Sequence, residues 1–263
     1  MSQILVNNVQ KVFKTPGRDV VALKDIQLQI RAGEFVCLLG PSGCGKSTLL
    51  NAVAGFALPS AGHIAIEDRI VSGPGPDRGM VFQEYALFPW MTVAQNIAFG
   101  LEIQKKSKEE IGATLEQLLD LLHLKDFRDR FPKDLSGGMR QRVAIARVLA
   151  LDSPIMLMDE PFGALDALTR RNLQDELLRI WHKLGKTILF VTHSIEESIY
   201  LADRIVVMTY RPGTVKRDQW VGLPRPRDPA SAEFNELKRE LGRLVMEEQQ
   251  RHASDEMKLA AVD

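Results

Sequence analysis

The chain has 263 residues, of which 45% are hydrophobic and 26% are charged, a composition typical of soluble globular proteins. Its 34 basic and 34 acidic side chains give a formal net charge of zero, which disfavours a dedicated nucleic-acid surface because such surfaces carry excess basic charge. The sequence shows neither a signal peptide nor an apolar run near the roughly 20 residues that span a bilayer.

Short apolar segments alternate with polar residues from residue 3 to residue 30, and this period of two predicts antiparallel strands. The apolar segment Phe35–Leu39 then predicts a buried strand, and the residues from Leu49 onward predict a helix. The glycine-rich segment between them is expected to be a loop. The only cysteines, Cys37 and Cys44, lie in this strand and loop, which disfavours a disulfide framework and fits a reducing compartment.

This loop fits the phosphate-binding P-loop pattern GxxxxGK[ST] in the strand–loop–helix context that the pattern requires, which disfavours a chance glycine turn. Glycine lets the backbone wrap closely around an anion, and successive N–H groups then point inward at the positive end of the helix dipole. We expect the Lys46 ammonium to reach the terminal phosphates of a nucleotide and the Ser47 hydroxyl to ligate Mg²⁺, while Cys44 fills a small space in the loop. The predicted nucleotide-binding residues are Gly40, Pro41, Ser42, Gly43, Cys44, Gly45, Lys46, Ser47 and Thr48.

Two short strands are predicted next, followed by a loop of glycine and proline and by a central strand at Gly79–Phe82 that ends at Gln83. The pattern then becomes helical from about residue 84 to residue 150. Thr92 is expected to cap one helix, and Ser107 with Glu110 forms a capping box before another. Because no good strand interrupts these helices, we predict a helical subdomain inserted into an α/β core.

Strands return after residue 150 and alternate with helices, which implies right-handed crossovers and a parallel sheet. The fold class predicted is α/β, a P-loop NTPase core with a mixed, mostly parallel sheet, an antiparallel β subdomain and the inserted helical subdomain. We predict one domain over residues 1–230 and a C-terminal helix with a polar tail over 231–263, to which no function is assigned. The later elements are expected at Ile155–Met158 (strand), Thr169–Leu184 (helix), Thr187–Val191 (strand), Ile195–Ala202 (helix), Arg204–Met208 (strand) and Ala232 to about Gln250 (helix).

The strand that ends at Met158 is followed by two acidic residues, Asp159 and Glu160. In P-loop enzymes an acid at this strand end holds Mg²⁺ opposite the P-loop hydroxyl, so Asp159 is a predicted metal ligand. Glu160 is then the candidate general base that orients water toward the γ-phosphate. An exposed acidic pair at the start of a loop is the alternative, and the preceding P-loop favours the functional interpretation.

A second glycine turn, at Ser136–Gly138, precedes a predicted helix and forms another phosphate site by the same helix-dipole physics. The segment Leu135–Arg142 resembles the signature sequence of ATP-binding-cassette (ABC) ATPases, whose usual form has glutamine where this chain has Met139. A simple helix cap would explain the glycines but not the run Arg140–Arg142. The resemblance extends to about residue 215, and it implies that the signature closes over the nucleotide of a second copy through Ser136, Gly137, Gly138 and Met139.

The resemblance implies further roles for single residues, which occur in the family's order. Phe13 stands where the family stacks an aromatic ring on adenine. Gln83 matches the Q-loop glutamine, which contacts Mg²⁺ and the attacking water, so Ser47, Gln83 and Asp159 form the predicted metal set. Asp166 resembles the D-loop aspartate at the dimer contact, and His193 resembles the switch histidine that grips the γ-phosphate. The predicted catalytic residues are Glu160, His193, Gln83 and Lys46.

Two classes of ABC ATPase are compatible with these motifs: the energising subunit of a membrane importer, and a soluble ATPase of iron–sulfur assembly, translation or DNA maintenance. The chain lacks the long coiled coil of DNA-repair members and the second cassette of translation members. The apolar and aromatic segment Gln83–Val93 resembles the importer surface that receives a helix of the membrane permease. The alternative for Leu87 and Val93 is that they pack in the core beneath the helical subdomain. The amino-acid sequence of this region resembles that of the nitrate, sulfonate and taurine branch of importers. The expected docking residues are Tyr85, Leu87, Phe88 and Trp90.

The resemblance therefore implies an ATP-hydrolysing subunit that uses ATP and Mg²⁺ and energises the uptake of a small anionic solute. It also implies a homodimer that docks on permease subunits at the cytoplasmic face of the cell membrane. An extracytoplasmic solute-binding protein is an indirect partner, and no nucleic acid is expected to bind. In the implied two-state clamp, two copies close on ATP and open after hydrolysis, because only the triphosphate bridges the halves.

Overall fold

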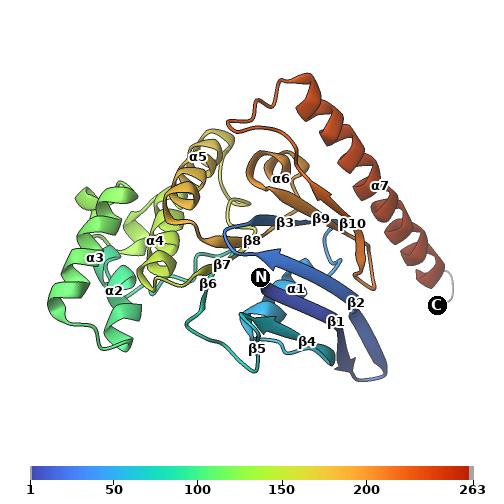
Figure 1. Cartoon of the computed structure of the whole chain (residues 1–263), viewed down its shortest axis with the longest axis horizontal. Helices are drawn as coiled ribbons and strands as arrows, with labels where there is room; N and C mark the ends of the chain where they lie inside the picture. The colour runs from blue at the N-terminus through green and yellow to red at the C-terminus, as the bar shows by residue number, and fades with distance from the viewer. Residues whose placement is uncertain (1, 261–263) are drawn as a thin grey trace. The chain divides into compact units, whose positions relative to one another are not determined.

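The structure is a computed structural model that describes residues 2–260 and contains two compact units (Figure 1). The first unit joins Met1–Gly75 to Thr187–Asp263, and the second unit is Pro76–Lys186. Within the described residues, none of the helices combines the length and the apolar character needed to cross a membrane. The predicted domain boundary at residue 230 stays a prediction.

The N-terminal part of the first unit is an antiparallel sheet in the order β2-β1-β4-β5, as the alternating sequence predicts. Along β2 the side chains of Ile26, Leu28 and Ile30 are buried, whereas Gln27 and Gln29 between them are exposed. Successive side chains of a strand point to opposite faces, so this alternation gives the sheet one apolar face. The strands are β1 (Ser2–Thr15), β2 (Arg18–Arg31), β4 (Ala61–Ile66) and β5 (Arg69–Ile70).

The first unit also contains four neighbouring strands in the order β10-β9-β3-β8. β3 pairs in parallel with β8 and β9, and β10 pairs antiparallel to β9, so the predicted mixed, mostly parallel arrangement is confirmed. Leu39 lies opposite both Thr192 and Val207, which aligns the carboxyl ends of the three parallel strands. The elements are β3 (Phe35–Leu39), α1 (Lys46–Ala54), β8 (Thr187–Thr192), α6 (Ile195–Leu201), β9 (Arg204–Met208) and β10 (Val215–Trp220).

The C-terminal helix α7 (Ala232–Ala260) packs against α6 and β9 in the same unit (Figure 1). Its residues Phe234 and Leu241 are fully buried. The helix continues to Ala260, beyond the predicted end near Gln250, because residues 251–260 contain no glycine or proline that would stop it. Helix α7 therefore packs on elements of the first unit through buried apolar side chains.

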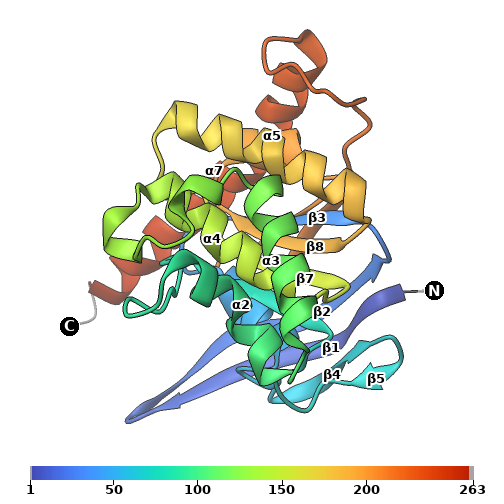
Figure 2. The same cartoon turned by 90° about the vertical axis from the view of Figure 1, so that its left-hand side faces the viewer.

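The second unit contains a parallel strand pair and the predicted helical segment, in which α2, α3 and α4 lie next to one another (Figure 2). Gly100 allows the close approach of α2 to the end of α4, because a Cβ at this position would lie 2.3 Å from Leu151 Cδ2. The elements are β6 (Arg78–Val81), α2 (Val93–Ile103), α3 (Lys108–Leu121), α4 (Gly137–Ala150), β7 (Ile155–Asp159) and α5 (Ala167–Leu184), with 3₁₀ turns at Lys125–Phe127 and Pro132–Asp134.

Both predicted helix caps of the second unit are confirmed. Thr92 Oγ1 accepts a hydrogen bond from the Gln95 N–H at 3.3 Å, and Gln95 Oε1 accepts one from the Thr92 N–H at 2.8 Å. Ser107 and Glu110 form the same reciprocal pair at the start of α3, and hydrogen bonds from Ser107 lower the pKa of Glu110. These caps satisfy N–H groups that the helices themselves leave without acceptors.

Asn96 fixes the segment that leads into α2. Its side chain is fully buried and accepts a hydrogen bond from the Phe88 N–H at 2.9 Å. Its amide nitrogen lies 3.2 Å from the carbonyl oxygen of Phe88 and 3.0 Å from those of Met91 and Thr92. One side chain therefore satisfies several backbone groups of an irregular segment, a role that the sequence pattern does not reveal.

We predict that Asn96→Ala lowers the free energy of unfolding by about 2 kcal/mol, because buried backbone groups lose their partners. Urea denaturation followed by circular dichroism measures this change. The control is Gln117→Ala on the exposed face of α3, which should cost less than about 0.5 kcal/mol. Equal effects of the two variants would show that Asn96 does not hold the segment.

Candidate functional site

The loop between β3 and α1 has the backbone that the P-loop pattern predicts. Gly43 and Gly45 adopt φ values of +77° and +99°, which residues with a side chain rarely adopt. A Cβ on Gly45 would also lie 2.7 Å from Leu23 Cδ2 and 3.0 Å from the Ala22 carbonyl oxygen. Glycine is thus required at position 45 for both its conformation and its lack of volume.

Lys46 is the first residue of α1, and its side chain is buried within the loop. Its Nζ donates hydrogen bonds to the carbonyl oxygens of Gly40 at 2.8 Å and Pro41 at 2.9 Å. The N-cap residue, Gly45, has no side chain with which to cap the first turn of α1. A buried ammonium thus lies beside backbone N–H groups at the positive end of a helix dipole, an arrangement suited to an anion.

Cys44 is fully buried, and its Sγ lies 3.7 Å from Lys46 Nζ. Burial raises the pKa of this thiol more than the neighbouring Lys46 lowers it. The pKa of Cys37 is also raised, by burial first and then by the charge of Glu197. Both cysteines are therefore protonated packing residues at neutral pH, which agrees with the interpretation of Cys44 as a residue that fills the loop.

His193 and Phe13 belong to the same unit as the loop. His193 follows β8, which pairs with β3 so that Thr192 lies opposite Leu39; His193 therefore leaves the same strand edge as the P-loop and is exposed. Phe13 lies on β1 with 42% of its surface exposed, and Lys11 Nζ lies 5.3 Å from its ring centroid. An exposed ring of this kind has a surface available for stacking.

In the second unit the parallel pairing of β6 with β7 sets Val81 opposite Met158. Gln83, which is exposed, and the half-buried Asp159 and Glu160 therefore occur where neighbouring parallel strands end, the edge at which ligands bind in open α/β sheets. Glu160 has a φ of +42°, in the left-handed region that residues with a side chain seldom adopt. Backbone strain of this kind concentrates at functional sites.

The signature segment forms the start of α4. Ser136 is the N-cap, and its Oγ accepts a hydrogen bond from the Met139 N–H at 3.3 Å. The N–H groups of Gly137 and Gly138 occur in the first turn, where an α-helix supplies no acceptor of its own. A Cβ on Gly138 would lie 2.6 Å from Thr169 Cγ2, so packing against α5 requires glycine there.

The charged residues near the signature have structural partners within the second unit. The Arg140 guanidinium lies 5.6 Å from the ring centroid of Tyr85, and Arg142 Nε donates to Glu176 Oε2 at 3.0 Å. Packing therefore explains the arginines that a glycine cap alone leaves unexplained. Asp166 is the N-cap of α5, and hydrogen bonds from the Thr169 backbone lower the pKa of its exposed carboxyl group.

The aromatic segment after β6 has both buried and exposed side chains. The Phe88 ring packs 4.6 Å from the Phe99 ring and 5.7 Å from the Trp90 ring, measured between centroids. Trp90 is 70% exposed, whereas Leu87 is half-buried and Val93 is fully buried. The alternative of core packing is thus correct for Val93, and Trp90 presents the largest exposed aromatic surface of the segment.

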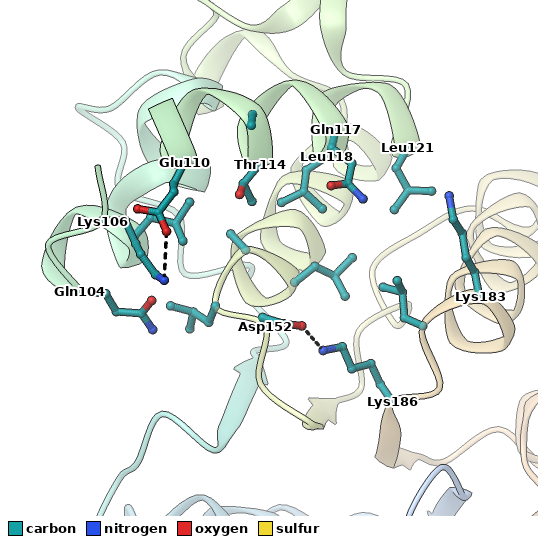
Figure 3. Close-up of a pocket in the computed structure, with 16 residues that line it drawn as sticks. Gln104, Lys106, Glu110, Thr114, Gln117, Leu118, Leu121, Asp152, Lys183 and Lys186 are labelled. Atoms are coloured by element: carbon teal, nitrogen blue, oxygen red, sulfur yellow. Dashed lines mark hydrogen bonds and ion pairs between the residues drawn. The ribbon is translucent and has the colours of Figure 1, made fainter. Parts of the chain in front are cut away.

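A hollow of about 720 Å³ on the helices of the second unit has a leucine-rich floor and a charged rim (Figure 3). At the rim, Lys106 pairs with Glu110 at 3.4 Å and Lys186 pairs with Asp152 at 2.5 Å. None of the predicted nucleotide, metal or docking residues lines it. The hollow is therefore separate from the candidate site residues of this unit.

Known proteins resemble this chain in both sequence and structure. Residues 23–163 match the sequence profile of the ABC transporter family. A nitrate import ATP-binding protein of Synechocystis sp. is 47% identical over 235 residues, which cover 89% of this chain and 88% of the relative. A taurine import ATP-binding protein of Ruegeria pomeroyi is 46% identical over 243 residues, which cover 92% of this chain and 90% of the relative. The solved structure of a dimeric ATP-binding cassette in a post-hydrolysis state, bound to ADP and Pi, has a TM-score of 0.74 and 33% identity, covering 84% of this chain and 100% of that chain.

The family match contains the P-loop, Gln83, the signature and Glu160, whereas Phe13 and His193 lie outside it. The two import proteins align with this chain over most of their length, and the cassette structure has the same fold at 33% identity. The chain belongs to the ABC transporter family.

Proposed function

We propose that this chain is the ATP-binding and ATP-hydrolysing subunit of an importer, and that it energises the uptake of a small anionic solute such as nitrate, a sulfonate or taurine. The observation that carries the ATPase is the buried Lys46 ammonium, held by two loop carbonyls beside the start of α1. The importer branch rests on the relatives that are named for nitrate and taurine import.

In this proposal Lys46 and the P-loop N–H groups bind the phosphates of ATP, and Phe13 stacks on the adenine ring. Glu160 accepts a proton from the attacking water as general base, and His193 donates a hydrogen bond to the γ-phosphate. Ser47, Gln83 and Asp159 would hold Mg²⁺, since hydroxyl, amide and carboxylate oxygens are the hard ligands that this ion prefers. The bound ion would supply positive charge that stabilises the transferred phosphoryl group.

A second copy of the chain completes the site. Gly137 and Gly138 offer backbone donors at the start of a helix, and Ser136 orients that helix start through its bond to the Met139 N–H. Asp166 lies at the start of the next helix, where we propose that the two copies meet. Because each signature would contact the nucleotide bound by the other copy, ATP binding brings two chains together and hydrolysis releases them.

The partner outside the dimer is a membrane permease, and the docking surface is the segment that contains Tyr85, Leu87, Phe88 and Trp90. Its exposed aromatic side chain, Trp90, suits a partner with an apolar helix. Two hydrogen bonds hold the backbone of this segment. Asn96 Oδ1 accepts one from the Phe88 N–H, and Arg147 Nη2 donates one to the Tyr85 carbonyl oxygen at 3.3 Å. An extracytoplasmic protein would deliver the solute to the permease, and the chain itself would act at the cytoplasmic face of the membrane.

Lys46→Ala should lower ATPase activity by about 10²-fold or more, because it removes the charge that stabilises the transferred phosphoryl group. Phosphate release measures turnover, and isothermal titration calorimetry measures nucleotide binding. Lys108→Ala, at an exposed position of α3, is the control and should leave both quantities unchanged. Unaltered turnover and binding in Lys46→Ala would reject the site.

Glu160→Gln should lower the rate of hydrolysis by about 10²- to 10⁴-fold and still bind ATP, because the amide preserves shape but not basicity. The variant should therefore form a dimer with ATP and remain monomeric with ADP. Size-exclusion chromatography with light scattering measures the mass in each case. Glu102→Gln on the exposed face of α2 should hydrolyse ATP at the normal rate, and a Glu160→Gln chain that stays monomeric with ATP contradicts the proposed clamp.

Trp90→Asp should abolish binding to permease vesicles and leave the turnover of the detached chain within about threefold, since a charge on the docking surface disfavours an apolar interface. Cosedimentation with the vesicles measures binding. The matched control is Ile103→Asp, because Ile103 is 69% exposed on the same unit. If Ile103→Asp prevents docking and Trp90→Asp does not, the surface has been assigned to the wrong residues.

A further inference from the structure

The turn that joins β9 to β10, residues 209–214, contacts the P-loop within the first unit. Arg211 Nε donates a hydrogen bond to the Gly43 carbonyl oxygen at 3.2 Å. Gly213 donates its N–H to the Ala22 carbonyl oxygen at 2.9 Å, and a Cβ on Gly213 would lie 2.2 Å from the Cys44 carbonyl oxygen. The turn thus lies against the backbone of two consecutive loop residues.

The contact of Arg211 fixes the direction of one peptide group of the loop. In a trans peptide the carbonyl and the N–H point in opposite directions, so a Gly43 carbonyl that faces Arg211 turns the Cys44 N–H the other way. On that side the Cys44 N–H donates a hydrogen bond to the Pro41 carbonyl oxygen at 3.4 Å, and the same oxygen also accepts a hydrogen bond from Lys46 Nζ. Arg211 therefore holds the Cys44 N–H on the side of the loop where the Lys46 charge lies.

This peptide group needs such support because Gly43 has no Cβ. Its φ of +77° lies in a region that glycine enters and leaves at little cost, so the carbonyl of Gly43 could rotate away from its present direction. The Tyr210 ring covers the same place, since its Cε2 would lie 3.9 Å from a Cβ on Gly43. Tyr210 and Arg211 together thus limit the movement of the residue on which the loop shape depends.

The C-terminal helix holds the turn in place. Glu248 of α7 is almost fully buried, and its Oε2 accepts a hydrogen bond from the Tyr210 N–H at 3.0 Å. Its Oε1 accepts one from Lys216 Nζ at 2.8 Å. The ring of His252 lies 3.9 Å from the Tyr210 ring, measured between centroids. The backbone and the ring of Tyr210 are therefore both attached to α7, one residue before Arg211.

The charge of Glu248 makes this attachment strong at neutral pH. Burial alone would raise its pKa, but hydrogen bonds from Lys216 and from the Tyr210 N–H, with the charges of Lys216 and Arg251, lower the pKa below its usual value. The carboxylate is therefore ionised, and hydrogen bonds to an ionised acceptor are about twice as strong as neutral ones. A continuous series of contacts thus joins α7 to Tyr210, Arg211 and the Gly43 carbonyl.

We propose that Arg211 is a positioning residue of the nucleotide site: it holds the Gly43–Cys44 peptide in the direction in which the Cys44 N–H closes the turn of the P-loop on the Pro41 carbonyl oxygen, and α7 keeps Arg211 in place. This inference rests on the proposed nucleotide site and assigns a role to the C-terminal helix. Arg211 acts through the backbone and touches no phosphate. Its loss should therefore weaken every nucleotide that occupies the loop, whether or not it carries a γ-phosphate.

The test compares the dissociation constants of ADP and ATP, measured by calorimetry in the presence of Mg²⁺, for the full chain and three variants. Arg211→Ala should raise both constants by the same factor of about 3 to 10, the effect of one hydrogen bond to a backbone carbonyl. Arg211→Gln retains an N–H donor without the charge and should fall between Arg211→Ala and the unchanged chain. Arg217→Ala removes an equal charge from an exposed position of the same unit and should change either constant by less than about twofold.

Three results would overturn the proposal. An effect of Arg211→Ala on ATP alone would mean that the guanidinium contacts the γ-phosphate directly. Equal effects of Arg211→Ala and Arg217→Ala would mean that overall charge and not the Gly43 contact matters. Normal binding by Arg211→Ala, when Lys46→Ala has lost binding, would reject the role of Arg211 and retain the nucleotide site; if Lys46→Ala also binds normally, the site itself is wrong.

The part played by α7 has its own test. His252→Ala removes the ring that packs on Tyr210 and leaves the Glu248 carboxylate in place, so the helix should remain folded. The variant should raise both dissociation constants by about twofold, and the double variant with Arg211→Ala should bind as Arg211→Ala does, because residues of one network are not additive. Additive effects, or no effect of His252→Ala, would show that α7 does not act through Arg211.

Discussion

The parallel pairing of buried strands is the constraint on which the placement of the candidate site depends. In the first unit Leu39 lies opposite Thr192, so the loop after β3 and His193 after β8 leave the same edge. In the second unit Val81 lies opposite Met158, so Gln83 and Asp159 likewise occur at one edge, where β6 and β7 end together. Side chains that are far apart in the sequence become neighbours because parallel strands end together, and polar residues can appear there without interrupting the apolar core.

The P-loop adds electrostatics to this geometry. A buried ammonium is costly unless it is hydrogen-bonded, and the carbonyl oxygens of Gly40 and Pro41 accept from Lys46. These partners are neutral dipoles, so they satisfy the donor without cancelling its charge as a carboxylate would. The loop therefore keeps a positive charge beside the start of α1, where the backbone N–H groups and the helix dipole also favour an anion. The same argument explains why the shape of the loop, which the Gly43 peptide helps to set, matters as much as its residue types.

Much of this organisation could be predicted from the sequence, because it rests on local signals. The period-two alternation of β1 and β2, the apolar runs of β3, β7 and β8, and the capping boxes at Thr92 and Ser107 each depend on a few adjacent residues. The candidate site residues at strand ends follow from the same runs. The family resemblance was confirmed by a match over residues 23–163 and by relatives that align over most of the chain.

What the sequence did not reveal depends on contacts between distant residues. Asn96 gives no pattern that distinguishes a buried anchor from a polar surface residue, and Arg140 and Arg142 gain partners only when α5 and Tyr85 are in place. The absence of glycine and proline after residue 250 is consistent with the continuation of α7, but the sequence does not indicate that α7 contacts the turn between β9 and β10. Glu248 lies 38 positions after Tyr210, and Arg211 lies 168 positions after Gly43. No local rule links such pairs, so their role becomes visible only in the folded unit.

The signature shows how a departure from a family's sequence can leave its physics unchanged. The side chains of Ser136 and Asp166 both serve as helix caps, so each accepts a backbone hydrogen bond of its own helix. The proposed phosphate site at the start of α4 would then use the N–H groups of Gly137 and Gly138, together with the helix dipole. Met139 donates its backbone N–H to the Ser136 cap. Its side chain takes part neither in this cap nor in the set of backbone N–H donors. A methionine in place of glutamine therefore preserves the donors of the signature, and it changes only the side-chain contacts that a second copy would meet.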